Sequence, residues 1–106
     1  MKPIRSYASV TLWIDNVNRY YHLAEDEWSP RLAALETFCE RMGKDPDAII
    51  REAKDEKGAK VEFMRLLNRV AKELYDDPKA AHDWNNAIRS FFQHNGARVV
   101  VKPYPE

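Results

Sequence analysis

The apolar residues of this chain recur at intervals of three and four, the spacing that places side chains on one face of an α-helix. The pattern predicts a first helix over residues 9–24, whose apolar positions are Val10, Trp13, Ile14, Val17, Tyr20 and Tyr21. Residues 10–14 on their own are also compatible with a short strand, because a brief apolar run does not distinguish the two.

Proline and glycine divide the following residues into three further helices. The Ser-Pro pair at 29–30 is a typical helix start and Gly43 a typical end, which predicts a second helix between them. The Asp-Pro pair at 45–46 opens a short third helix that stops before Gly58. The fourth helix is predicted over residues 59–75, with an apolar face made of Val61, Met64, Leu67, Val70, Ala71 and Leu74.

A fifth helix, from Pro78 to the Asn-Gly pair at 95–96, has the clearest signals. Asp77 is placed to cap its start, proline is tolerated at the first helical position, and Asn-Gly is a common stop. One face is predicted to be buried and consists of Trp84, Ala87, Ile88, Phe91 and Phe92. The opposite face carries hydrogen-bond donors, namely Lys79, His82, Asn86, Arg89 and Gln93. Such donors suit phosphates and base edges, although a solvated face explains the same pattern.

These elements predict an all-α fold, a bundle of four to five short helices formed by residues 1–97. At 106 residues and 44% hydrophobic content the chain is long enough for one core. After Gly96 the helical pattern stops, and three consecutive valines at 99–101 precede Pro103 and Pro105. Residues 98–106 are therefore predicted to form an extended tail or a short strand.

The charges balance overall but are distributed unevenly. The chain has 17 basic and 17 acidic residues, and both ends are mildly basic. The segment 25–62 is acidic, with seven basic against eleven acidic residues. Nucleic acid is compatible with the two ends, although a free-standing non-specific binder is normally far more basic.

Few residues suggest catalysis or metal binding. Cys39 is the only cysteine and lies on an apolar stripe, so we expect a core residue and no internal disulfide. The three histidines, at 22, 82 and 94, lack ligand spacing with each other or with Cys39, and no glycine-rich phosphate loop is present. No apolar run approaches the ~20 residues of a membrane span. We therefore expect a cytoplasmic, non-catalytic domain with no cofactor, no metal and no membrane contact.

The order of three motifs is more specific than any single residue. Residues 35–50 read LETFCERMGKDPDAII, and after a further helix residues 87–96 read AIRSFFQHNG. This order resembles the N-terminal core-binding domain of tyrosine recombinases, the phage-type integrases, and is most similar to archaeal members. The resemblance covers residues 10–102.

The resemblance implies a SAM-like helical domain that clamps the duplex of a recombination site. Strand exchange would belong to the separate catalytic domain of the parent recombinase, to which residues 98–106 would lead. The implied DNA contacts are Lys79, His82, Asn86 and Arg89, together with Arg31 and Lys44. The isolated domain is expected to be a monomer. The family often has threonine where this chain has Glu27 and Ala80, which weakens the transfer of individual contacts.

Two other functions fit the same helix count. A helical protein–protein interaction module of the SAM or death-domain kind has this size, and oppositely charged patches would allow head-to-tail association. A helix-turn-helix regulator would use the last two helices around residues 76–78 and would form a dimer on a palindromic site.

Overall fold

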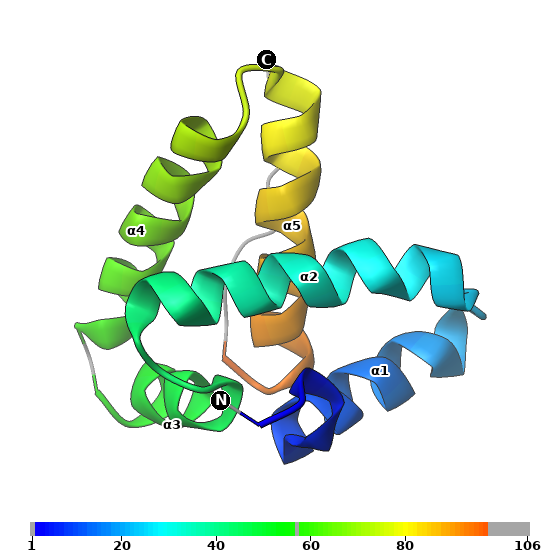
Figure 1. The fold of residues 1–106 in the computed structure, drawn as a ribbon. Helices are drawn as coiled ribbons and strands as arrows, with labels where there is room; N and C mark the ends of the chain where they lie inside the picture. The colour runs from blue at the N-terminus through cyan, green and yellow to red at the C-terminus, as the bar shows by residue number, and fades with distance from the viewer. Residues whose placement is uncertain (1, 57, 98–106) are drawn as a thin grey trace.

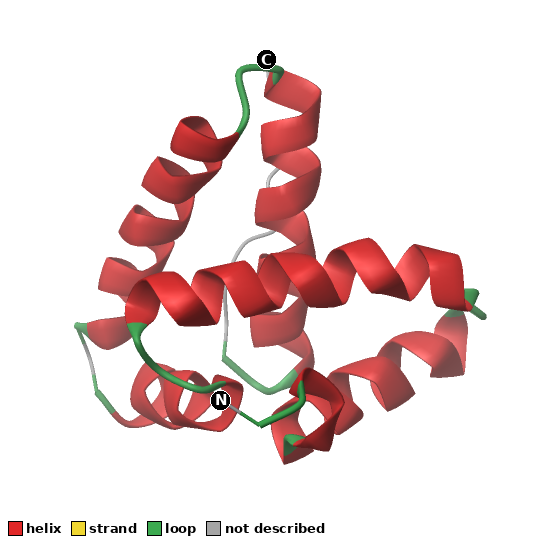
Figure 2. Cartoon of the chain, viewed as in Figure 1, coloured by secondary structure: helices red, strands yellow, loops and turns green. Residues whose placement is uncertain are grey.

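The computed structural model describes residues 2–56 and 58–97 of the chain. A short 3-10 helix η1 (Ile4–Ser6) precedes five α-helices, which are α1 (Ala8–Tyr20), α2 (Glu25–Met42), α3 (Pro46–Asp55), α4 (Ala59–Leu74) and α5 (Pro78–His94). The described residues contain helices and loops but no strand (Figure 2). The predicted all-α fold is confirmed, and residues 10–14 are helical. The predicted tail, residues 98–106, lies outside the described part of the chain.

Helix α5 occupies the centre of the bundle and packs against α1, α2 and α4. In Figure 1, α2 crosses in front of α5, while α4 and α1 lie on either side of it. The apolar face predicted for α5 is confirmed, since Ile88, Phe91 and Phe92 are fully buried and Trp84 is nearly so. The ring of Phe91 meets Trp13 of α1 edge-on, with ring centroids 5.5 Å apart.

Local capping signals set the ends of the later helices as predicted. The Asp45 carboxylate accepts a hydrogen bond from the Ala48 backbone N–H at 2.8 Å and begins α3. Gly43 ends α2 in the left-handed region at φ 66°, and Gly96 follows α5 at φ 82°. Because a side chain at positive φ is strained, glycine suits both positions.

The start of α1 is held by residues that lie far away in the chain. Asp47 of α3 accepts hydrogen bonds from both the backbone N–H and the hydroxyl of Ser9. The Asn95 side chain, just after α5, donates to the Ser9 carbonyl at 3.0 Å and to the Phe91 carbonyl at 2.9 Å. The first turn of α1 is thus joined to α3 and to the end of α5.

The predicted end of the first helix, at residue 24, is wrong by four residues. Helix α1 stops at Tyr20, and the chain turns there around Asn18. The Asn18 side-chain oxygen accepts hydrogen bonds from the Leu23 backbone at 3.3 Å and from the Trp28 indole at 3.2 Å. This interaction fixes a turn that the apolar pattern does not reveal.

The predicted start of the second helix, at residues 29–30, is also wrong. Helix α2 begins at Glu25, so Pro30 lies inside its second turn. Proline there removes one backbone hydrogen bond. The burial of Trp28 offsets the loss of this hydrogen bond. Its indole packs edge-on against Trp13, with ring centroids 5.2 Å apart. Burial of that indole holds the first turn in place despite the proline.

The apolar face of α4 differs from the prediction at three positions, one of which is Leu74 at the end of the helix, which is 38% exposed. Val61 is 58% exposed, and Phe63, which the spacing did not include, is buried. Phe63 packs beside Phe92 of α5, with ring centroids 6.1 Å apart. The helix is rotated so that the larger aromatic side chain reaches the core and the valine faces solvent.

Candidate nucleic-acid interface

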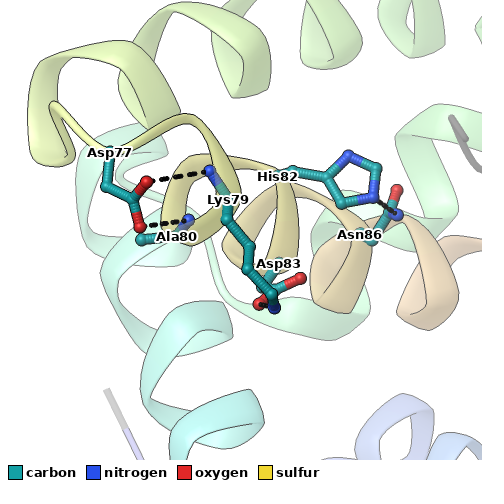
Figure 3. A network of polar contacts seen from close by, with 6 residues as sticks. All are labelled: Asp77, Lys79, Ala80, His82, Asp83 and Asn86. Carbon is teal, nitrogen blue, oxygen red and sulfur yellow. Dashed lines mark hydrogen bonds and ion pairs between the residues drawn. The ribbon is translucent and has the colours of Figure 1, made fainter. Parts of the chain in front are cut away.

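The start of α5 is closed by its own capping residue. The Asp77 carboxylate accepts hydrogen bonds from the backbone N–H groups of Lys79 and Ala80, both at 3.3 Å (Figure 3). The predicted cap is confirmed. It also occupies the N–H groups that a phosphate would otherwise bind at a helix start. An approaching phosphate therefore meets the Asp77 carboxylate at this point, and its favourable contacts must come from side chains.

Lys79 lies at the exposed edge of this first turn. Its ammonium group is 2.8 Å from the Asp83 carboxylate one turn further along, and both side chains are more than half exposed. Water and salt screen such an exposed pair, so its contribution to folding is small. The lysine can exchange a carboxylate for a phosphate partner at low cost.

His82 and Asn86 form a second pair along the same helix. Nδ2 of Asn86 lies 2.9 Å from Nε2 of His82, and Figure 3 shows the imidazole ring beside the amide. In the tautomer that accepts this bond, the other ring nitrogen of His82 carries a proton. Both side chains are partly exposed. The pair therefore presents hydrogen-bonding groups of the kind that bind nucleic acid.

Arg89 does not lie on the exposed polar face, and the prediction is wrong on this point. Its side chain is only 4% exposed. Nε of Arg89 donates to the side-chain oxygen Oδ1 of Asn85 at 2.6 Å, and Nη2 donates to Oδ1 of Asn68 in α4 at 3.1 Å. Burial lowers the pKa of the Arg89 guanidinium. The arginine instead helps join α4 to α5, because α4 packs over this edge of α5.

The two remaining candidates, Arg31 in α2 and Lys44 just past its end, lie in different places. Arg31 lines a groove of about 850 Å³ between α1, α2 and α5, and Asp83 and Asn86 line the same groove. Lys44 lies at the other end of α2, 3.1 Å from the Glu52 carboxylate of α3. Tertiary structure thus brings Arg31 next to the polar side of α5 and keeps Lys44 apart from it.

Helix α4 contributes residues that the sequence did not single out. A second groove, of about 620 Å³, runs between α4 and α5 and is lined by Asn68 and Lys72 from one helix and by His82 and Asn86 from the other. Asn68 accepts from Asn85 at 2.8 Å as well as from Arg89. The available signal was the set of polar residues on α4 at spacings of three and four, to which Asn68 and Lys72 belong.

The other reactive groups among the described residues are dispersed, and Cys39 is the most deeply buried of them. Cys39 is buried as predicted, and burial together with the nearby Asp45, Glu36 and Glu40 raises the pKa of its thiol to about 12. Within residues 2–56 and 58–97 no group of three or more His, Cys, Asp or Glu side chains is placed to hold a metal ion. In that same part of the chain, no helix combines the length and apolar character needed to cross a bilayer.

Comparisons with family models, with curated protein sequences and with solved structures found no match to this chain. The resemblance to recombinase core-binding domains therefore stays a prediction.

Proposed function

We propose that this chain is the DNA-binding domain of a site-specific tyrosine recombinase, which holds duplex DNA without catalysing strand exchange. The observation that supports this function best is the polar side of α5. Lys79, His82 and Asn86 lie there on successive turns of one helix, while its opposite side is anchored in the core. In this proposal the catalytic domain of the parent recombinase, in the cytoplasm, performs the chemistry.

The dimensions of α5 fit this role. Its 17 residues span about 25 Å at ~1.5 Å per residue, which suits a helix lying along or across a major groove. Lys79 supplies a positive charge for phosphate, and asparagine, the residue type at position 86, is one that pairs with an adenine edge once its amide turns outward. Arg31 of α2 lines the groove beside Asn86 and adds a second positive charge.

Acidic residues set the expected strength of binding. Asp77 accepts from the Lys79 backbone and Asp83 pairs with its ammonium group, and the chain as a whole has no net charge. Because non-specific affinity for DNA comes mainly from basic residues that neutralise phosphates, we expect weak binding that weakens further as salt rises. Arg89 has no direct contact in this proposal; it positions α5 through Asn68 and Asn85.

A titration of the full 106-residue chain with a short duplex, followed by NMR at low and at physiological salt, tests the function. We expect shifts at Lys79, His82 and Asn86 that fade as salt rises. Lys79→Ala should reduce the slope of log affinity against log salt by about 1. The matched control is Lys54→Ala on α3, which also removes one exposed lysine. The proposal fails if low-salt spectra do not change on adding DNA.

A self-associating helical module is the second candidate, and one observation favours it. The first turn of α2 is acidic, with Glu25, Asp26 and Glu27, while α4 is basic, with four basic and two acidic residues. Surfaces of opposite sign on different helices permit head-to-tail contacts between copies. Line broadening of the protein alone at high concentration, with no response to DNA, would support this module.

A further inference from the structure

Helix α4 carries the largest excess of positive charge of the five helices. It holds four basic residues, Lys60, Arg65, Arg69 and Lys72, against two acidic ones, Glu62 and Glu73. Arg65 and Arg69 are exposed over 72% and 66% of their side chains, and Lys72 is also exposed. Because Arg65, Arg69 and Lys72 are spaced by four and three residues, they lie in one row on the solvent side of the helix.

The length of this row suits a phosphate backbone. At ~1.5 Å per residue, Arg65 and Lys72 are separated by about 10 Å along the helix axis. Each DNA strand carries one phosphate per ~3.4 Å of duplex axis, so several phosphates fall within the reach of the three side chains. The row, which we call the α4 basic row, thus matches a polyanion rather than a single acidic group.

The acidic neighbours of the row hold it only loosely. The Arg65 guanidinium is 3.2 Å from Glu62, and Arg69 is 4.0 Å from Glu73. Glu73 also pairs with Arg41 of α2 at 2.9 Å, so its charge is shared between two arginines. Exposed pairs of this kind contribute little to folding, and both arginines can turn to a phosphate at low cost.

We infer that the α4 basic row is a second DNA-binding surface, which grips the phosphate backbone without reading sequence. The inference rests on the proposed function for the identity of the ligand, duplex DNA. Lys72 connects the row to α5, because it lines the same groove as His82 and Asn86. DNA that lies along α5 would therefore pass beside Lys72, at one end of the row.

The test compares two triple variants of the full chain in a salt series with a labelled duplex, read by fluorescence anisotropy. Arg65→Ala, Arg69→Ala and Lys72→Ala together should lower the slope of log affinity against log salt by about 2 to 3. The matched control combines Arg19→Ala, Arg51→Ala and Lys54→Ala, three exposed basic residues on α1 and α3. The control should leave the slope within about 1 of the unmodified chain. Circular dichroism checks that both variants are folded.

A variant that binds DNA more tightly provides a second test, because misfolding would weaken binding and not strengthen it. Glu62→Gln with Glu73→Gln removes two negative charges beside the row while preserving the shape of both side chains. We expect tighter binding at low salt, and the difference from the unmodified chain should disappear at high salt. Equal affinities at every salt concentration would count against the row.

The outcomes separate this inference from the function on which it rests. If the unmodified chain binds DNA and the α4 triple variant retains its full salt slope, the row is excluded and the function stands. If the unmodified chain does not bind duplex at low salt, the DNA-binding function itself is overturned. If the unmodified chain does not bind duplex and the triple variant abolishes its self-association, the row contacts another copy of the chain, and both proposals are overturned.

Discussion

The two ends of α5 are held in the bundle in different ways. At the C-terminal end, Asn95 bonds to the carbonyls of Ser9 and Phe91, and the Asn16 amide donates to the His94 carbonyl at 3.1 Å. At the N-terminal end, Asp77 accepts from the backbone N–H groups of Lys79 and Ala80, and Lys79 pairs with Asp83, so these contacts lie within the helix and its cap. The first end is fixed by distant parts of the chain and the second largely by its own sequence.

Because of this difference, the C-terminal end of α5 contributes mainly to stability, and the N-terminal end is the part suited to binding. Contacts between distant residues cannot form unless the whole bundle folds, so disturbing the C-terminal end should destabilise the entire protein. Exposed pairs within a helix contribute little to folding, which leaves the N-terminal end suited to a partner. Substitutions placed along α5 and in the core beside it test this division.

The largest effect is expected at the C-terminal end. Phe91→Ala removes a fully buried ring that packs on Trp13 and Phe92. We expect the free energy of unfolding to fall by ~3 to 5 kcal/mol, because the lost contacts leave a cavity. Urea denaturation followed by circular dichroism measures the change. A loss below ~1 kcal/mol would show that this end is not the anchor of the helix.

An alkaline titration tests the core that faces α5. Burial raises the pKa of the Cys39 thiol from its ordinary 9.0 to about 12, so the folded protein favours the neutral thiol. The contribution of this group to stability is complete below about pH 9 and is lost as pH rises toward 12. Denaturation midpoints should fall over this range, and they should fall less steeply in Cys39→Ala. Parallel slopes for the two proteins would contradict a buried neutral thiol.

The smallest effect is expected at the N-terminal end. Asp77→Ala removes the cap of α5 and should cost ~1 kcal/mol, whereas Asp77→Asn should be nearly neutral, because asparagine caps as well. In hydrogen exchange, the amides of Lys79 and Ala80 should lose protection more than the amide of Phe91. Equal acceleration at both ends would mean that the helix responds as one unit and that the comparison does not hold.

Structure was predicted correctly from sequence where the residues that determine a helix start or end lie within one short segment. Asp45 and Asp77 each cap a helix that begins at the next residue, and Gly43 ends α2 through its own backbone conformation. The apolar stripe of α5 was correct because the helix faces the core on one side along its length. For the candidate site, the sequence identified Lys79, His82 and Asn86 on one helix but not their neighbours on α4.

Prediction failed where the cause lies in a second segment. The sequence by itself determined an all-α protein, the bounds of its later helices and the side of α5 that is buried, because helical periodicity and capping act over a few residues. Only the tertiary structure decided that Asn18 ends α1 by bonding to Trp28, that α2 begins before Pro30, and that Arg89 is buried against Asn68. These outcomes depend on contacts between residues 10 to 21 positions apart, which no local pattern specifies.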